Sequence, residues 1–182
     1  MKKLAFLLTS ICLAIICNCQ TKKDLFDWKD FSSDSAGFKI KSPCILSEWD
    51  KSNQQSKDTL QYQCIEKDYR IKIIVGKFKN AEERERAIAN LKFVSKDFKI
   101  IYPGIIKSES KDYTKDEIIG LQSDYELTNK DKIKNLYLID QKSVFNVVIY
   151  ITRSSNQSDD EFNEFYTSLS EKMVDSFELV KK

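Results

Sequence analysis

Two kinds of periodicity alternate along this chain, and their order decides which folds are open to it. In seven segments apolar residues alternate with polar ones, which is the pattern of a β-strand with one buried face. The predicted strands are residues 37–42, 59–66, 69–78, 105–113, 117–127, 132–141 and 144–153. Short polar turns separate the last four, so we expect an antiparallel meander whose apolar side chains lie mainly on one face.

Two other segments have the spacing of an amphipathic helix. Asn80 with Glu83, and Ser158 with Glu161, are capping-box pairs that mark the two helix starts. The first predicted apolar stripe is Ala87, Ile88, Leu91, Val94 and Phe98, and the second is Phe162, Phe165, Tyr166, Leu169, Met173 and Phe177. Together these elements predict an α+β domain, in which an antiparallel sheet of about six to seven strands is packed by two main helices.

This order of elements resembles the PsbP-like fold. Phe31-Ser32-Ser33, followed by Gly37-Phe38-Lys39-Ile40 and Pro43, resembles the opening strand of that family. The closing strands and helix of the family have their counterparts near the other end of this chain. The residues that resemble them are Tyr125-Glu126-Leu127, 134–139, 145–151 and 162–177, with the ending Asp175-Ser176-Phe177. The resemblance spans residues 31–180 and implies an α/β sandwich. It rests on structural residues, so it implies a fold and no function, and the manganese and calcium of the photosynthetic members have no matching ligand motif here.

The first nineteen residues have the features of an export signal. Lys2 and Lys3 precede an apolar run of about a dozen residues, which is too short to span a bilayer comfortably. The segment that ends in Cys17-Asn18-Cys19 resembles the lipobox of bacterial lipoproteins, in which the modified cysteine becomes the mature N-terminus. Cys19 follows Asn18 whereas Cys17 follows the bulky Ile16, so Cys19 is the expected lipidation site. The alternative is an ordinary secreted protein with cysteines near its cleavage site.

Cleavage before Cys19 would divide the chain into three parts. Residues 1–18 are the expected lipoprotein signal peptide, 19–35 a tether whose aromatics dock on the domain, and 36–182 a single PsbP-like domain. Loss of Lys2 and Lys3 leaves 28 basic and 28 acidic side chains in the mature chain. This neutral, interspersed charge argues against a nucleic-acid partner, because such proteins gather basic residues on one face.

Cys44 and Cys64 remain as an even pair when Cys19 is acylated. In an oxidising compartment they are expected to form a disulfide, which would join the first two predicted strands as neighbours. Two buried thiols are the alternative.

The sequence offers little catalytic chemistry. It contains no histidine, which removes Ser-His-Asp and Cys-His catalysis and histidine metal sites, and we expect no cofactor and no metal. Asp159, Asp160 and Glu161 suit a helix N-terminus better than a calcium site. Four aromatic residues form a core more readily than a ligand pocket at their spacings: Tyr137, Phe145, Tyr150 and Tyr166.

These observations favour a lipid-anchored, non-enzymatic module of the cell envelope that binds another protein. The alternative is a small-molecule or metal-binding module with a pocket between helix and sheet, and a hydrolase that uses Ser-Lys or carboxylate chemistry comes third. Residues 20–23 lack the acidic residues of inner-membrane retention signals, which favours the outer membrane.

Overall fold

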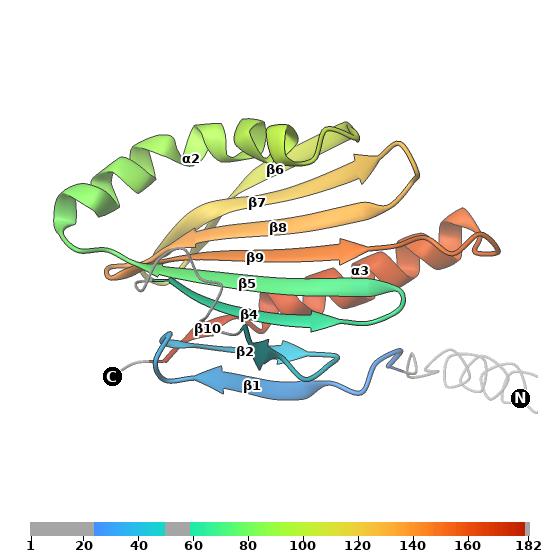
Figure 1. Cartoon of the computed structure of the whole chain (residues 1–182), viewed down its shortest axis with the longest axis horizontal. Coiled ribbons are helices and arrows are strands. Elements are labelled where there is room, and N and C mark those ends of the chain that lie inside the picture. Colours follow the sequence, from blue (N-terminus) through green and yellow to red (C-terminus); the bar gives the residue numbers. More distant parts are fainter. Residues whose placement is uncertain (1–23, 50–58, 181–182) are drawn as a thin grey trace, which may run out of the picture.

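The computed structural model describes residues 24–49 and 59–180. Two antiparallel sheets form in this part of the chain, one of seven strands and one of three (Figure 1). The larger sheet has the order β3-β4-β5-β9-β8-β7-β6, with bounds Ser47–Glu48, Thr59–Ile65, Tyr69–Lys77, Ser143–Ile151, Lys132–Ile139, Ile118–Leu127 and Ile105–Lys115. The smaller sheet has the order β1-β2-β10, with bounds Lys29–Ser33, Phe38–Ser42 and Glu178–Leu179. The helices are α2, Ala81–Ile101, and α3, Asp159–Asp175.

The α+β fold expected from the sequence is confirmed, and the meander from β6 to β9 is present. The expectation that its apolar side chains occupy mainly one face is wrong for the central strands. In β8, Ile133 and Leu136 point to opposite faces by strand alternation, and both are fully buried. Helices cover both faces: Phe98 of α2 stacks on Tyr125 of β7, and Tyr166 of α3 meets Lys134 of β8 from the other side.

The main core lies between the large sheet, α3 and the small sheet. Phe38 of β2 stacks on Phe177, at a ring-centroid distance of 5.8 Å, and packs edge-on against Phe145 and Tyr62. The Tyr62 hydroxyl also lies 2.7 Å from the Ser33 hydroxyl, which joins the two sheets by a buried hydrogen bond. The small sheet is therefore a second wall of the core.

Helix α3 is as the sequence predicted. Ser158 and Glu161 form the reciprocal capping box. The predicted stripe faces the core, with Phe162, Tyr166, Leu169, Met173 and Phe177 buried and Phe165 partly buried. Asp159, Asp160 and Glu161 occupy the first turn, where carboxylates complement the helix dipole.

Helix α2 departs from its predicted packing. Asn80 accepts the Glu83 backbone N–H as its cap, but Phe98 is the one buried residue among those predicted to face the core. Ala87, Ile88, Leu91 and Val94 are half-buried. The helix arches over β7 and β8 and rests on them mainly through its C-terminal end (Figure 1).

The expected tether is shorter than residues 19–35, because Lys29–Ser33 pair with β2 as strand β1. The aromatics of this segment dock on the core as expected, with Phe26 in contact with Tyr69 and Phe165. Before them, Asp24 accepts hydrogen bonds from Trp28 (2.7 Å) and from Lys172 of α3. Both hydrogen bonds lower the pKa of Asp24, and the bond from Lys172 has the larger effect. We call this arrangement the N-terminal clasp. Cys19 lies outside the described residues.

No helix in residues 24–49 and 59–180 is long and apolar enough to cross a membrane.

Candidate functional site

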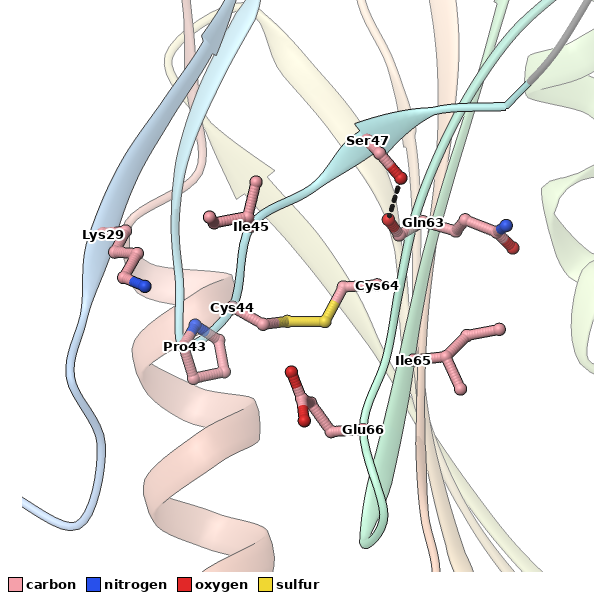
Figure 2. A pocket seen from close by; sticks show the side chains of 9 residues that line it. All are labelled: Lys29, Pro43, Cys44, Ile45, Ser47, Gln63, Cys64, Ile65 and Glu66. Atoms are coloured by element: carbon pink, nitrogen blue, oxygen red, sulfur yellow. Dashed lines mark hydrogen bonds between the residues drawn. A yellow bond between two sulfur atoms is a disulfide. The ribbon is translucent and has the colours of Figure 1, made fainter.

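Cys44 and Cys64 form a disulfide, with their Cα atoms 6.3 Å apart (Figure 2). The sequence suggested that this disulfide would join two neighbouring strands, and that expectation is wrong. Cys44 lies in the bend between β2 of the small sheet and β3 of the large sheet, and Cys64 lies in β4. The bond therefore links the crossing between the two sheets to the large sheet.

A shallow depression of about 410 Å³ lies beside this disulfide. Figure 2 shows Lys29 and Pro43 on one side of it and Gln63, Ile65 and Glu66 on the other. Ile45 and Ile65 are 75% and 61% exposed at its rim. With one ammonium and one carboxylate group among its lining residues, the depression is poorly equipped for chemistry.

The most unusual polar group is Lys134, whose side chain is 6% exposed. Its Nζ donates to Asp124 Oδ1 at 2.6 Å across the β7–β8 pair, where the two residues are direct partners. The Tyr166 hydroxyl of α3 donates to the same oxygen. Asp124 thus joins the sheet to the helix and neutralises a charge that is buried beneath it.

Tyr166 is held in its neutral form. Burial first, and then the neighbouring Asp124 charge, raises the pKa of Tyr166 far above its ordinary value, so its hydroxyl remains a donor. The Nζ atoms of Lys132 and Lys134 lie 5.0 and 5.7 Å from the centre of its ring, within the range of cation–π attraction. Lys132 also donates to Asn163 Oδ1 of α3 at 2.5 Å.

This cluster borders a pocket of about 160 Å³ between α3 and strands β6 to β8. Its lining residues are Lys107, Glu109, Asp124, Tyr125, Glu126, Lys132 and Tyr166. Of the four aromatics considered from the sequence, Tyr166 lines this pocket, whereas Phe145 is fully buried in the core. By strand alternation Tyr137 and Tyr150 lie on the opposite face of the sheet from Tyr166. Tyr150 donates there to Asp131.

In the described part of the chain, no three or more Cys, Asp or Glu side chains are grouped so that they could hold a metal ion. Asp159 instead pairs with Arg153 at 2.5 Å, which lowers its pKa, first through the hydrogen bond and then through the charge.

A second feature is a set of exposed apolar side chains where α2 leads into β6. Phe93, Ile100, Ile101 and Ile106 are 45%, 74%, 69% and 62% exposed. We call these four residues the α2–β6 patch. The sequence analysis assigned the charged face of α2 to solvent and did not single out these residues. The available signal was that Ile100 and Ile101 are apolar but fall outside the predicted stripe.

The fold and these sites define an α+β domain with a small polar pocket and an exposed apolar patch. No protein-family model and no curated protein matches the sequence. Solved structures do match. The Ran-binding protein Mog1p of Saccharomyces cerevisiae aligns over 86% of this chain and 97% of its own, with 11% identity and a TM-score of 0.50. Cyanobacterial PsbP (CyanoP) of Synechocystis aligns over 87% of this chain and 95% of its own, with 12% identity and a TM-score of 0.49.

At this identity the likeness to Mog1p concerns the fold alone.

Proposed function

We propose that this chain is a bacterial envelope lipoprotein, acylated at Cys19, whose domain is a non-enzymatic module that binds another protein. Two observations of different kinds support this. The sequence from Lys2 to Cys19 has the order of a charged segment, an apolar run and a cysteine. A lipoprotein carries more than one acyl chain, which is sufficient for stable anchoring without a spanning helix.

The observation that carries the binding function is the α2–β6 patch. Single exposed apolar residues are common on protein surfaces, but half of the eight large apolar side chains that are exposed in the described part of the chain fall within fourteen positions of the sequence. Ile100 and Ile101 lie at the end of α2, next to the turn into β6. A helix end with large apolar side chains and a partly unfilled apolar face suits contact with a partner protein.

The outer membrane is the proposed location. Gln20, Thr21, Lys22 and Lys23 would follow the acylated cysteine, and none of them is acidic. Protease treatment of intact cells, before lysis, tests whether the domain faces the periplasm or the outside, because only a domain on the outer surface would be cleaved.

The anchor is tested by feeding cells an alkyne fatty acid and detecting the label on the protein. We expect label on the wild-type chain and on Cys17→Ser, and none on Cys19→Ser, which should also move to the soluble fraction. The Cys17→Ser variant is the matched control, because it removes a thiol two residues away. Label that persists on Cys19→Ser would exclude this residue as the anchor.

Binding is tested in the same cells with a photo-cross-linking residue at Ile100, and at the exposed Lys142 on the β8–β9 turn as control. The expected result is one adduct from position 100, of a mass other than that of two copies, and none from position 142. The adduct should disappear when Ile101 and Ile106 are both changed to Ser. Equal labelling from both positions, or no adduct, would contradict a partner at the patch.

A second candidate function is binding of a small polar molecule in the pocket between α3 and the sheet. The observation that favours it is the combination of ammonium, carboxylate and phenol groups around about 160 Å³. A ligand there would raise the Tm of the wild-type protein, and the response would be lost in Tyr166→Phe.

A further inference from the structure

Strand β6 forms a free edge of the large sheet. It is eleven residues long, and in the described part of the chain no strand pairs with its outer side. Most of its side chains are exposed. Such an edge presents a row of unpaired backbone donors and acceptors to any extended chain that fits it.

The charges along β6 complement a second copy of the same strand in the register that overlaps the strand along its whole length. If two copies run antiparallel with Ser110 opposite Ser110, all eleven residues overlap, because Ser110 is the midpoint of Ile105–Lys115. Glu109 of each copy then lies opposite Lys111 of the other, which gives two opposite-charge pairs. Ser108 lies opposite Asp112, so a hydroxyl donor meets a carboxylate.

Neighbouring registers lack this complementarity. Antiparallel partners must share a face of the sheet, so a symmetric register can shift its centre only by whole residues. Centring the pair on Glu109 places Glu109 opposite itself and Lys107 opposite Lys111. Centring it on Lys111 places Lys111 opposite itself and Lys107 opposite Lys115. Like charges opposite each other destabilise a strand pair.

The charged side chains of β6 are also free to pair with those of a second copy. Lys111 has no ion-pair partner among residues 24–49 and 59–180, and neither does Asp112. Glu109 is paired within the strand to Lys107, at 3.0 Å, and both side chains are well exposed. A carboxylate at the surface can accept a second ammonium group, so the pair with Lys107 need not break.

We propose that β6 pairs with β6 of a second copy of this chain, so that two seven-stranded sheets become one continuous antiparallel sheet. The two-fold axis passes through the sheet at Ser110, which leaves both α3 helices on one side and both α2 helices on the other. Because the strand is irregular between Ile105 and Lys107, the regular pairing in this register runs from Lys107 to Tyr113, with Lys107 of each copy opposite Tyr113 of the other. This inference does not depend on acylation of Cys19 or on the α2–β6 patch.

The full chain, purified in mild detergent, is examined by sedimentation velocity. We expect a dimer for the wild type. Either Glu109→Lys or Lys111→Glu should raise the dissociation constant about tenfold, because each turns two attractive pairs into repulsive ones. The double variant with both changes should return to the wild-type value.

Glu117→Lys is the matched control, because it makes the same change of charge in the exposed turn just after β6. It should leave the dimer unchanged. A monomeric wild type, or a double variant no better than the single ones, would overturn the proposal.

A covalent readout checks the register. Ser110→Cys should form a disulfide-linked dimer on mild oxidation, because the two residues face each other across the axis. Ser108→Cys lies on the same side of the strand but should form no such disulfide. In this register residue 108 faces residue 112 of the second copy, so the two introduced cysteines are four positions apart along the strand. Equal cross-linking of both variants would rule out this register.

Discussion

Replacing Asp124 with alanine is expected to lower the free energy of unfolding by about 3 to 4 kcal/mol, because removing one partner strands a buried charge. Asp124 is 37% exposed, so the cost does not come from its own burial. It comes from Lys134, which is almost wholly buried and has the Asp124 carboxylate as its bonded counter-ion. The change also removes the acceptor of the Tyr166 hydroxyl, which loosens the contact of α3 with the sheet.

A second change should separate these causes. In the Asp124→Ala background, Lys134→Met removes the stranded ammonium group and should recover more than half of the lost stability. Glu126→Ala is the control, because Glu126 lies on the same strand and face but pairs with no buried charge among residues 24–49 and 59–180. It should cost less than about 1 kcal/mol. Urea unfolding followed by tryptophan fluorescence gives all four values, and equal losses for Asp124→Ala and Glu126→Ala would contradict the argument.

Removing the disulfide is expected to cost about 3 kcal/mol. The bond closes a loop between residues separated by 20 positions, and in the chain-entropy model such a loop is worth about this much. The native fold should persist, because Phe38, Phe177 and the Ser33–Tyr62 hydrogen bond still join the two sheets. The measurement compares urea unfolding of Cys44→Ala/Cys64→Ala with that of the wild type.

Two controls accompany it. The single variant Cys64→Ala should be as unstable as the double variant, because either change removes the whole bond. The reduced wild type should lose a similar amount. A double variant within 1 kcal/mol of the oxidised wild type would show that the bond adds little beyond the contacts that already join the sheets.

Six strands of the larger sheet, both helices and strand β2 could be predicted because each has its own periodicity. The other two strands of the small sheet could not. Strand β1 has a single apolar residue, Phe31, and β10 has only two residues, so neither shows a period. Their pairing through β2 brings together the two ends of the domain, which is a property of the folded chain.

The disulfide was predictable in part. An even number of cysteines indicates a bond, but the elements that it joins depend on which sheet each strand enters. The same limit applies to Lys134. A lysine within a strand is ordinarily exposed, and its partner Asp124 becomes visible only when the β7–β8 register is known. The third member, Tyr166, lies on the predicted apolar stripe of α3, and that stripe did not indicate what its hydroxyl would meet.

Helix α2 shows a different limit. Its stripe was identified, but the amount of burial depends on how closely the helix approaches the sheet, and here it makes contact mainly near Phe98. The residues beyond the stripe, Ile100 and Ile101, were left exposed for the same reason.

The N-terminal clasp sets a length. Asp24 is fixed to α3 through Lys172, and five residue steps separate it from Cys19. Fully extended, those steps reach at most about 18 Å. If Cys19 is acylated, this short linker would keep the domain close to the bilayer surface. A partner protein would then have to reach the membrane surface, or be anchored to the membrane as well.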